Sequence, residues 1–157
     1  MSSEGSTTLF DPASRTALGR RVTQASLRDF AEQLRLRVAR KRPFVCLITG
    51  DAELLRLNAQ FRKKKYPTDV LSFPSGEARG GPLGEIAISA DRALEQSREH
   101  GHGVGDEIRI LMLHGVLHLM GHDHETDNGE MAKAEARWRK AFGLPLSLTE
   151  RAAVKQA

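Results

Sequence analysis

The sequence has few cysteines and no long apolar run, and each absence excludes a class of protein. Cys46 is the only cysteine in the chain, so no internal disulfide can form and the fold must rely on a hydrophobic core. Its apolar neighbours in segment 44–48 predict a buried thiol, as expected in a reducing cytoplasm. Residues 1–9 are polar and lack the basic and apolar regions of a secretory signal. No stretch approaches the roughly eighteen apolar residues of a membrane span, so we expect no membrane partner.

The composition is that of an ordinary folded protein with a small excess of basic residues. The chain has 157 residues, of which 39% are hydrophobic and 28% charged, enough for one domain with its own core. The formal net charge of +4 favours polyanionic partners such as RNA, but charge alone is weak evidence for nucleic-acid binding.

Apolar periodicity predicts five helices and three strands. The helices are expected at 23–40, 52–63, 91–100, 106–120 and 126–142, and the strands at 44–49, 69–73 and 84–89. Helices and strands do not alternate regularly, and no linker divides the chain. The sequence therefore predicts one α+β domain over 1–157, in which a small mixed sheet packs with about five helices. Loose tails are expected at about 1–8 and 146–157.

Four of the six histidines lie in the short segment 114–124. His114 and His118 are one helical turn apart, so both imidazoles project from the same face and can reach one ion. Gly121 is suited to end the helix, which would let His124 approach the same point from another direction. Three nitrogen ligands with one open position are typical of catalytic zinc, so we expect one zinc ion per chain.

His122 is an alternative third ligand. It would lie one turn beyond His118 if the helix continued, and it would then replace His124. We favour His124, because Gly121 is better placed to end a helix than to continue one. Asp123 either orients one of the ligands or is a solvated turn residue.

One residue expected of a zinc peptidase is missing. The spacing of the histidines is similar to that of metzincin peptidases, but Gly115 occupies the position of the glutamate that acts there as general base. Glycine cannot transfer protons, so proteolysis is disfavoured. A phosphodiester substrate instead needs positive charge near the metal, which Arg62 in the basic run 62–65 could supply, although such a run is equally typical of a solvated loop.

Several segments together resemble the YbeY family of endoribonucleases, also called rRNA maturation factors. The resemblance covers most of the chain and is carried by 57–58, 61–62, 66–74, 83–89 and 114–124. It implies that His114, His118 and His124 bind a metal usually taken as zinc, and that Arg62 is important for RNA cleavage. His114 and Arg62 are therefore the expected catalytic residues. Position 122 departs from the family, where tyrosine is common.

The resemblance also implies a biological role. It points to a single-strand-specific endoribonuclease that acts in maturation of the 3′ end of small-subunit ribosomal RNA and in ribosome quality control. The implied partners are RNA, ribosomal small-subunit proteins and an assembly GTPase, in the cytoplasm.

Two other functions remain open from the sequence. The first is a ribosome-assembly binding factor with a mainly structural zinc, which a fourth protein ligand would favour. The second is an amide hydrolase, which would need a carboxylate such as Glu85 or Asp69 to reach a water molecule on the metal.

Overall fold

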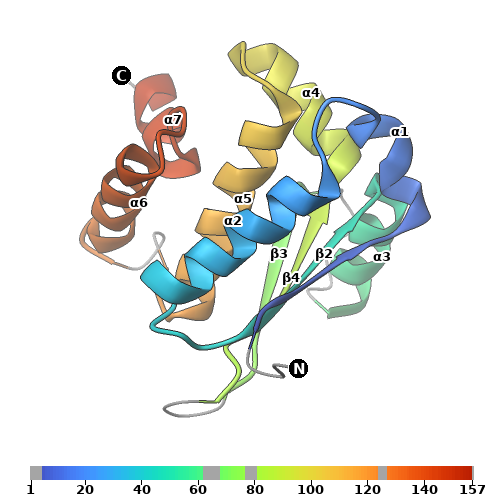
Figure 1. The fold of residues 1–157 in the computed structure, drawn as a ribbon. Helices are drawn as coiled ribbons and strands as arrows, with labels where there is room; N and C mark the ends of the chain where they lie inside the picture. Colours follow the sequence, from blue (N-terminus) through green and yellow to red (C-terminus); the bar gives the residue numbers. More distant parts are fainter. Residues whose placement is uncertain (1–4, 62–67, 77–80, 124–126, 157) are drawn as a thin grey trace.

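A four-stranded mixed sheet forms the centre of the protein. The computed structural model describes residues 5–61, 68–76, 81–123 and 127–156 (Figure 1). The strands are β1 (Thr7–Phe10), β2 (Phe44–Thr49), β3 (Val70–Pro74) and β4 (Gly84–Ser89), in the order β1-β2-β4-β3. β1, β2 and β4 are parallel, and β3 pairs with β4 in the antiparallel direction. The predicted mixed sheet in a single α+β domain is confirmed.

Seven α-helices lie in the described residues. They are α1 (Arg15–Leu18), α2 (Gln24–Arg37), α3 (Asp51–Phe61), α4 (Ala90–His100), α5 (Val104–Leu119), α6 (Glu130–Ala141) and α7 (Leu148–Gln156), and a 3-10 helix, η1 (Pro12–Ser14), precedes α1. All five expected helices are present, with ends that differ by a few residues. Local chemistry fixes several ends: the Thr23 hydroxyl accepts from the Ser26 amide before α2, and Gly101 ends α4 in the left-handed conformation. None of the helices described here is long and apolar enough to cross a membrane.

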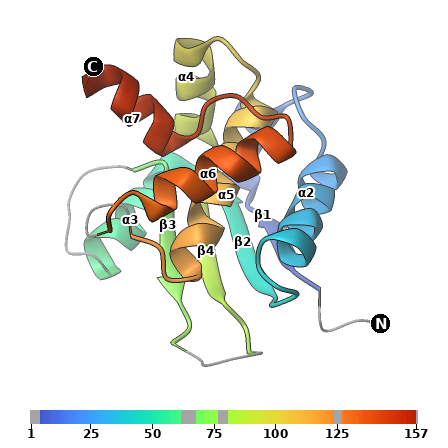
Figure 2. The same cartoon turned by 90° about the vertical axis from the view of Figure 1, so that its left-hand side faces the viewer.

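The helices cover the two faces of the sheet unequally. Figure 2 shows the strands between α3 on one side and α2 on the other, with α6 lying across α5. Ile86 and Ile88 of β4 belong to the large core cluster under α2 and α5, whereas Ala87 packs with Leu54 and Leu71 under α3. This alternation follows from the twofold side-chain period of a strand, and it decides which residues of β3 and β4 can approach α5.

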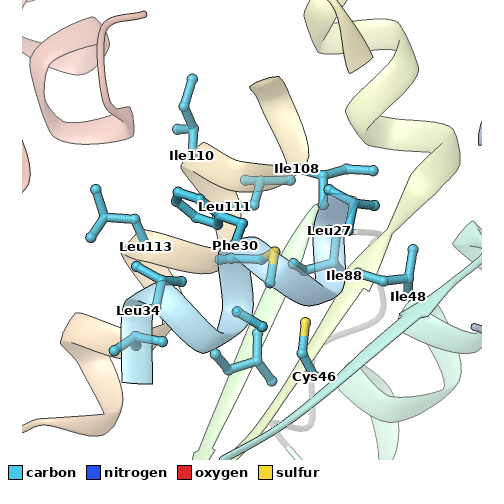
Figure 3. Packing of buried hydrophobic residues seen from close by; sticks show 14 of the residues in the cluster. Leu27, Phe30, Leu34, Cys46, Ile48, Ile88, Ile108, Ile110, Leu111 and Leu113 are labelled. Carbon is cyan, nitrogen blue, oxygen red and sulfur yellow. The ribbon is translucent and has the colours of Figure 1, made fainter. Parts of the chain in front are cut away.

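The main core lies between β2, β4, α2 and α5. Figure 3 shows residues from all four elements meeting there: Leu27, Phe30, Leu34, Cys46, Ile48, Ile88, Ile108, Ile110, Leu111 and Leu113. Cys46 is fully buried, and this burial raises the pKa of its thiol to about 12. The expectation of a buried, hydrophobic cysteine is confirmed.

Both predicted tails contain regular structure. The expectation of a loose segment at about 1–8 is wrong for Thr7 and Thr8, which pair with β2 at the edge of the sheet. The expectation of a loose segment at 146–157 is wrong for α7, which begins with a reciprocal cap. In this cap Glu150 accepts from the Ser147 amide, and Ser147 accepts from the Glu150 amide. Short, largely polar segments give weak periodicity, so such elements depend on tertiary contacts that the sequence pattern does not display.

Candidate metal centre

Two of the three predicted metal ligands, His114 and His118, lie on α5, a deeply buried helix. Nearly all of its residues are shielded from solvent, because it packs against β3 and β4 on one side and α6 on another. His114 is only 7% exposed, and His118 lies one turn later at the helix end and is partly exposed. A histidine ring in such a position needs polar partners, since unpaired buried nitrogen atoms are costly.

The rings of His114 and His118 approach each other at their Nε2 atoms. These atoms are 3.1 Å apart, and the ring planes are inclined by 74°. Two imidazole nitrogens bound to one tetrahedral zinc at the usual bond lengths are separated by about 3.3 Å. The spacing also permits a hydrogen bond between the rings. The geometry therefore fits a pair of zinc ligands as the sequence spacing requires.

The other nitrogen of His114 contacts a buried carboxylate that the sequence reasoning missed. Nδ1 of His114 hydrogen-bonds Oε2 of Glu135, which has no exposed surface. Oε1 of Glu135 accepts from the amide of Thr149 at 3.2 Å and from its hydroxyl at 2.9 Å. Burial alone would raise the pKa of Glu135, but the bond and charge of His114 and the bonds from Thr149 bring that pKa below its ordinary value.

Glu135 was recognisable in principle from helical spacing. It follows Met131 by four residues and precedes Trp138 by three, so it lies on the stripe that buries α6 against the core. A glutamate on such a stripe is unusual, because acidic side chains are rarely fully buried without a partner. The partner itself could not be found from the sequence, since His114 is far away along the chain.

The chain leaves the helical path soon after His118, as predicted. α5 ends at Leu119, and Gly121 has a φ of +100°, a value that favours glycine. The helix therefore stops before His122, whose amide donates back to the Leu117 carbonyl. The alternative that placed His122 one further turn along a continuous helix is wrong, because that turn does not form. Asp123 is exposed.

Two predicted site residues cannot be placed. His124, the expected third ligand, and Arg62, the expected catalytic arginine, both lie outside the described residues. In the parts of the chain that are described, no three histidine, cysteine, aspartate or glutamate side chains form a metal-binding group. Arg62 follows directly after Phe61, which ends α3 with 58% of its surface exposed and with its ring against Phe73.

At Gly115, α5 packs tightly against β4 of the sheet. A Cβ atom built there would meet Cγ2 of Ile86 at 2.9 Å and Cδ1 at 3.0 Å, shorter than ordinary carbon contacts. The Gly115 carbonyl accepts a 3.3 Å hydrogen bond from Ser72 of β3. This packing gives glycine a structural role at the position of the peptidase glutamate.

The two carboxylates considered for an amide hydrolase lie in different surroundings. Glu85 is exposed and alternates with Ile86 along β4, so it projects from the face of the sheet opposite α5. Glu85 therefore does not meet the requirement of the amide-hydrolase alternative for a carboxylate near the metal. Asp69 is partly buried just before β3, where desolvation raises its pKa and the charges of Glu107, His114 and Arg151 act on it. The Asp69 carbonyl accepts a 2.9 Å hydrogen bond from the Ser89 amide.

We predict that Gly115→Ala destabilises the protein despite the better helix propensity of alanine. That propensity would add about 1 kcal/mol in an open helix. Overlap with Ile86 should cost about 1–3 kcal/mol, so the free energy of unfolding should fall by about 1 kcal/mol. Urea unfolding measures the change. In an Ile86→Ala background, where the overlapping atoms are gone, the same substitution should stabilise; destabilisation there would contradict the packing argument.

A second buried carboxylate lies near the start of α5. Glu107 has no exposed surface, and its oxygens accept from the Arg151 guanidinium at 2.7 and 3.1 Å. His102 Nε2 lies 2.6 Å from the same carboxylate. Arg151 also donates to the Leu146 carbonyl. Because Arg151 belongs to α7 and Glu107 to α5, their hydrogen-bonded ion pair attaches α7 to α5.

Comparison with known proteins gives consistent matches along the chain. A family model described as Endoribonuclease YbeY matches residues 14–143. A relative from Solibacter usitatus with the same description is 55% identical over 150 residues, which are 96% of this chain and 97% of the relative. One from Koribacter versatilis is 47% identical over 130 residues, covering 83% of this chain and 84% of its own.

A solved structure is similar in fold. The solution structure of TM1509 from Thermotoga maritima superposes with a TM-score of 0.58 at 26% sequence identity. The match covers 87% of this chain and 89% of that chain. The two chains therefore share a fold over most of their length.

Proposed function

The chain belongs to the YbeY family of endoribonucleases, and from this membership we propose that it is a zinc-dependent enzyme that cuts single-stranded RNA. Its proposed role is maturation of the 3′ end of small-subunit ribosomal RNA, together with ribosome quality control. The proposed partners are ribosomal small-subunit proteins and an assembly GTPase, and this role would place the protein in the cytoplasm. Family resemblance supports these finer statements.

The observation that carries the metal proposal is the approach of two imidazoles on a buried helix. Nε2 of His114 and Nε2 of His118 are 3.1 Å apart, and Glu135 engages the far side of the His114 ring. His124 is proposed as the third ligand from its spacing after Gly121. A zinc ion bound by these three residues would polarise a phosphate oxygen and lower the pKa of a water molecule.

The remaining task of the protein is to bind and orient a charged backbone. We assign to Arg62 the stabilisation of negative charge that develops on the phosphate, because its planar guanidinium can donate two parallel hydrogen bonds. Phe61 directly precedes Arg62 in the chain, and its exposed ring offers a surface on which an unpaired base can stack. Duplex RNA keeps its bases stacked inside, so the stacking contact favours an unpaired substrate, whereas the phosphate contact of Arg62 contributes affinity.

Cleavage of a labelled ribosomal RNA fragment tests the proposal. The substrate should carry one single-stranded and one duplex region, and the enzyme should be zinc-loaded wild type, chelator-treated wild type or Arg62→Ala. We expect cuts only in the unpaired region, loss of cutting after zinc removal with recovery on adding zinc, and at least a tenfold slower rate for Arg62→Ala. Cutting that persists at full rate without zinc would exclude the metal mechanism.

A further outcome separates an enzyme from a binding factor. If the zinc-loaded protein binds ribosomal RNA but leaves it intact at every metal concentration, the zinc is structural and the proposed catalysis is wrong. If it cuts, sequencing of the product ends shows whether water or the ribose 2′-hydroxyl attacked the phosphate, because the two routes leave the phosphate on different fragments.

A further inference from the structure

We propose that Glu135 is a positioning residue for the metal centre and that Thr149 of α7 holds it in place, so that the C-terminal helix supports zinc binding. The inference rests on the proposed function, since it assigns His114 to the metal. It adds two residues, from α6 and α7, to a site that the sequence confines to segment 114–124 and Arg62.

The bond from Glu135 selects the form of the His114 ring that can bind a metal. Because the carboxylate accepts from Nδ1, the proton of the neutral imidazole is held on that nitrogen. Nε2 is then left with its lone pair directed toward Nε2 of His118. Carboxylates in this position fix the ring orientation of zinc-bound histidines and make the ligand nitrogen more basic.

Both oxygens of Glu135 are engaged, which fixes the carboxylate itself. Oε2 contacts His114, and Oε1 accepts two hydrogen bonds from Thr149, one from its amide and one from its hydroxyl. Rotation of the carboxylate would break at least one of these bonds. The orientation of the His114 ring therefore depends on where the first turn of α7 lies.

The two fully buried glutamates, Glu107 and Glu135, differ in the positive charge beside them, and this difference supports a cation next to His114. Glu107 has the guanidinium of Arg151 as its counter-charge. Glu135 is equally buried, yet among the described residues its ion-pair partner is a histidine, and no lysine or arginine pairs with it. A buried carboxylate is costly without positive charge nearby. A divalent cation on the far nitrogen of His114 would supply that charge.

The alternative is that Glu135 serves only to fasten α6 and α7 to α5. The two roles differ in what they do to metal affinity, because a fastening contact changes the stability of the metal-free protein without changing its affinity for zinc. Glu150 provides a matched control: it is adjacent to Thr149 and pairs with Arg139 at 2.9 Å, but no bond joins it to His114 or Glu135 among the described residues.

The test uses the full chain with Glu135→Gln, Thr149→Val, Thr149→Ser and Glu150→Gln. The zinc dissociation constant is measured by competition with a chromogenic chelator, and thermal unfolding is followed in excess chelator. Glu135→Gln should weaken zinc binding about 10- to 100-fold. Thr149→Val, which removes the hydroxyl at similar volume, should weaken it about three- to tenfold, and Thr149→Ser should stay within about twofold of wild type.

Glu150→Gln should lower the unfolding temperature while leaving the zinc dissociation constant within about twofold of wild type. Wild-type zinc affinity in Glu135→Gln, or an equal loss in Glu150→Gln, would overturn the inference. If Glu135→Gln does not fold, the zinc dissociation constants of Thr149→Val and Thr149→Ser are compared instead. Equal constants for these two variants would overturn the inference. A wild type that binds zinc but cuts no RNA would refute the proposed function and leave the role of Glu135 intact.

Discussion

Replacing His114 by alanine is expected to reduce RNA cleavage by at least a hundredfold and to abolish stoichiometric zinc binding. The ring supplies one of the two nitrogens that lie 3.1 Å apart on α5. Stabilisation of charge by a metal ion contributes several kcal/mol to such a reaction, and each 1.4 kcal/mol corresponds to about a factor of ten in rate. His118→Ala should give the same loss. Rates on a single-stranded fragment and zinc content by mass spectrometry measure both effects.

A matched histidine control excludes a general effect of removing an imidazole. His100 lies on α4, where its ring stacks on His102 rather than on the α5 pair. His100→Ala should retain both zinc and the wild-type rate. Wild-type rates in His114→Ala and His118→Ala, at wild-type stability, would contradict the assignment of these residues to the reaction.

Removing the guanidinium of Arg151 should lower the free energy of unfolding by about 3 kcal/mol. Arg151→Ala leaves the carboxylate of Glu107 buried without its strongest counter-charge, and breaking one side of a buried pair typically costs about 3–5 kcal/mol. His102 retains its contact with Glu107, so we place the effect at the lower end of that range. Urea unfolding at neutral pH measures the loss.

The partly exposed pair of Arg139 and Glu150 is a direct comparison, because it also attaches α7. Its side chains are 20% and 19% exposed, and pairs that remain in contact with water contribute about 0–1 kcal/mol. Arg139→Gln should therefore cost far less than Arg151→Ala. Similar losses for the two variants would show that burial of Glu107 does not govern the stability of this contact.

The strongly periodic elements were predictable because their pattern reflects burial directly. Strands 44–49 and 84–89 were predicted with the bounds that β2 and β4 have, since their apolar runs end at glycine or at a capping residue. The same reasoning located α5 and the helix stop at Gly121. Spacing on a helix fixes geometry, and so the pairing of His114 with His118 was also predictable.

Contacts between distant segments were not predictable. α7 was predicted to be a loose tail, although Ser147 and Glu150 have the spacing of a capping box and Arg151 is the partner of buried Glu107. Glu135 was not predicted because the other residues on its helix face are mostly apolar and indicate core packing. In both cases the missing information is tertiary, because each residue gains its role from a partner more than ten positions away.

The attachment of α7 also sets an order of events during translation. Thr149 and Arg151 are synthesised after all four strands and after α5, yet they supply partners to carboxylates on α5 and α6. A nascent chain can assemble the sheet while Glu107 and Glu135 still lack these partners. It can complete both contacts only when the segment around 147–151 has left the ribosome.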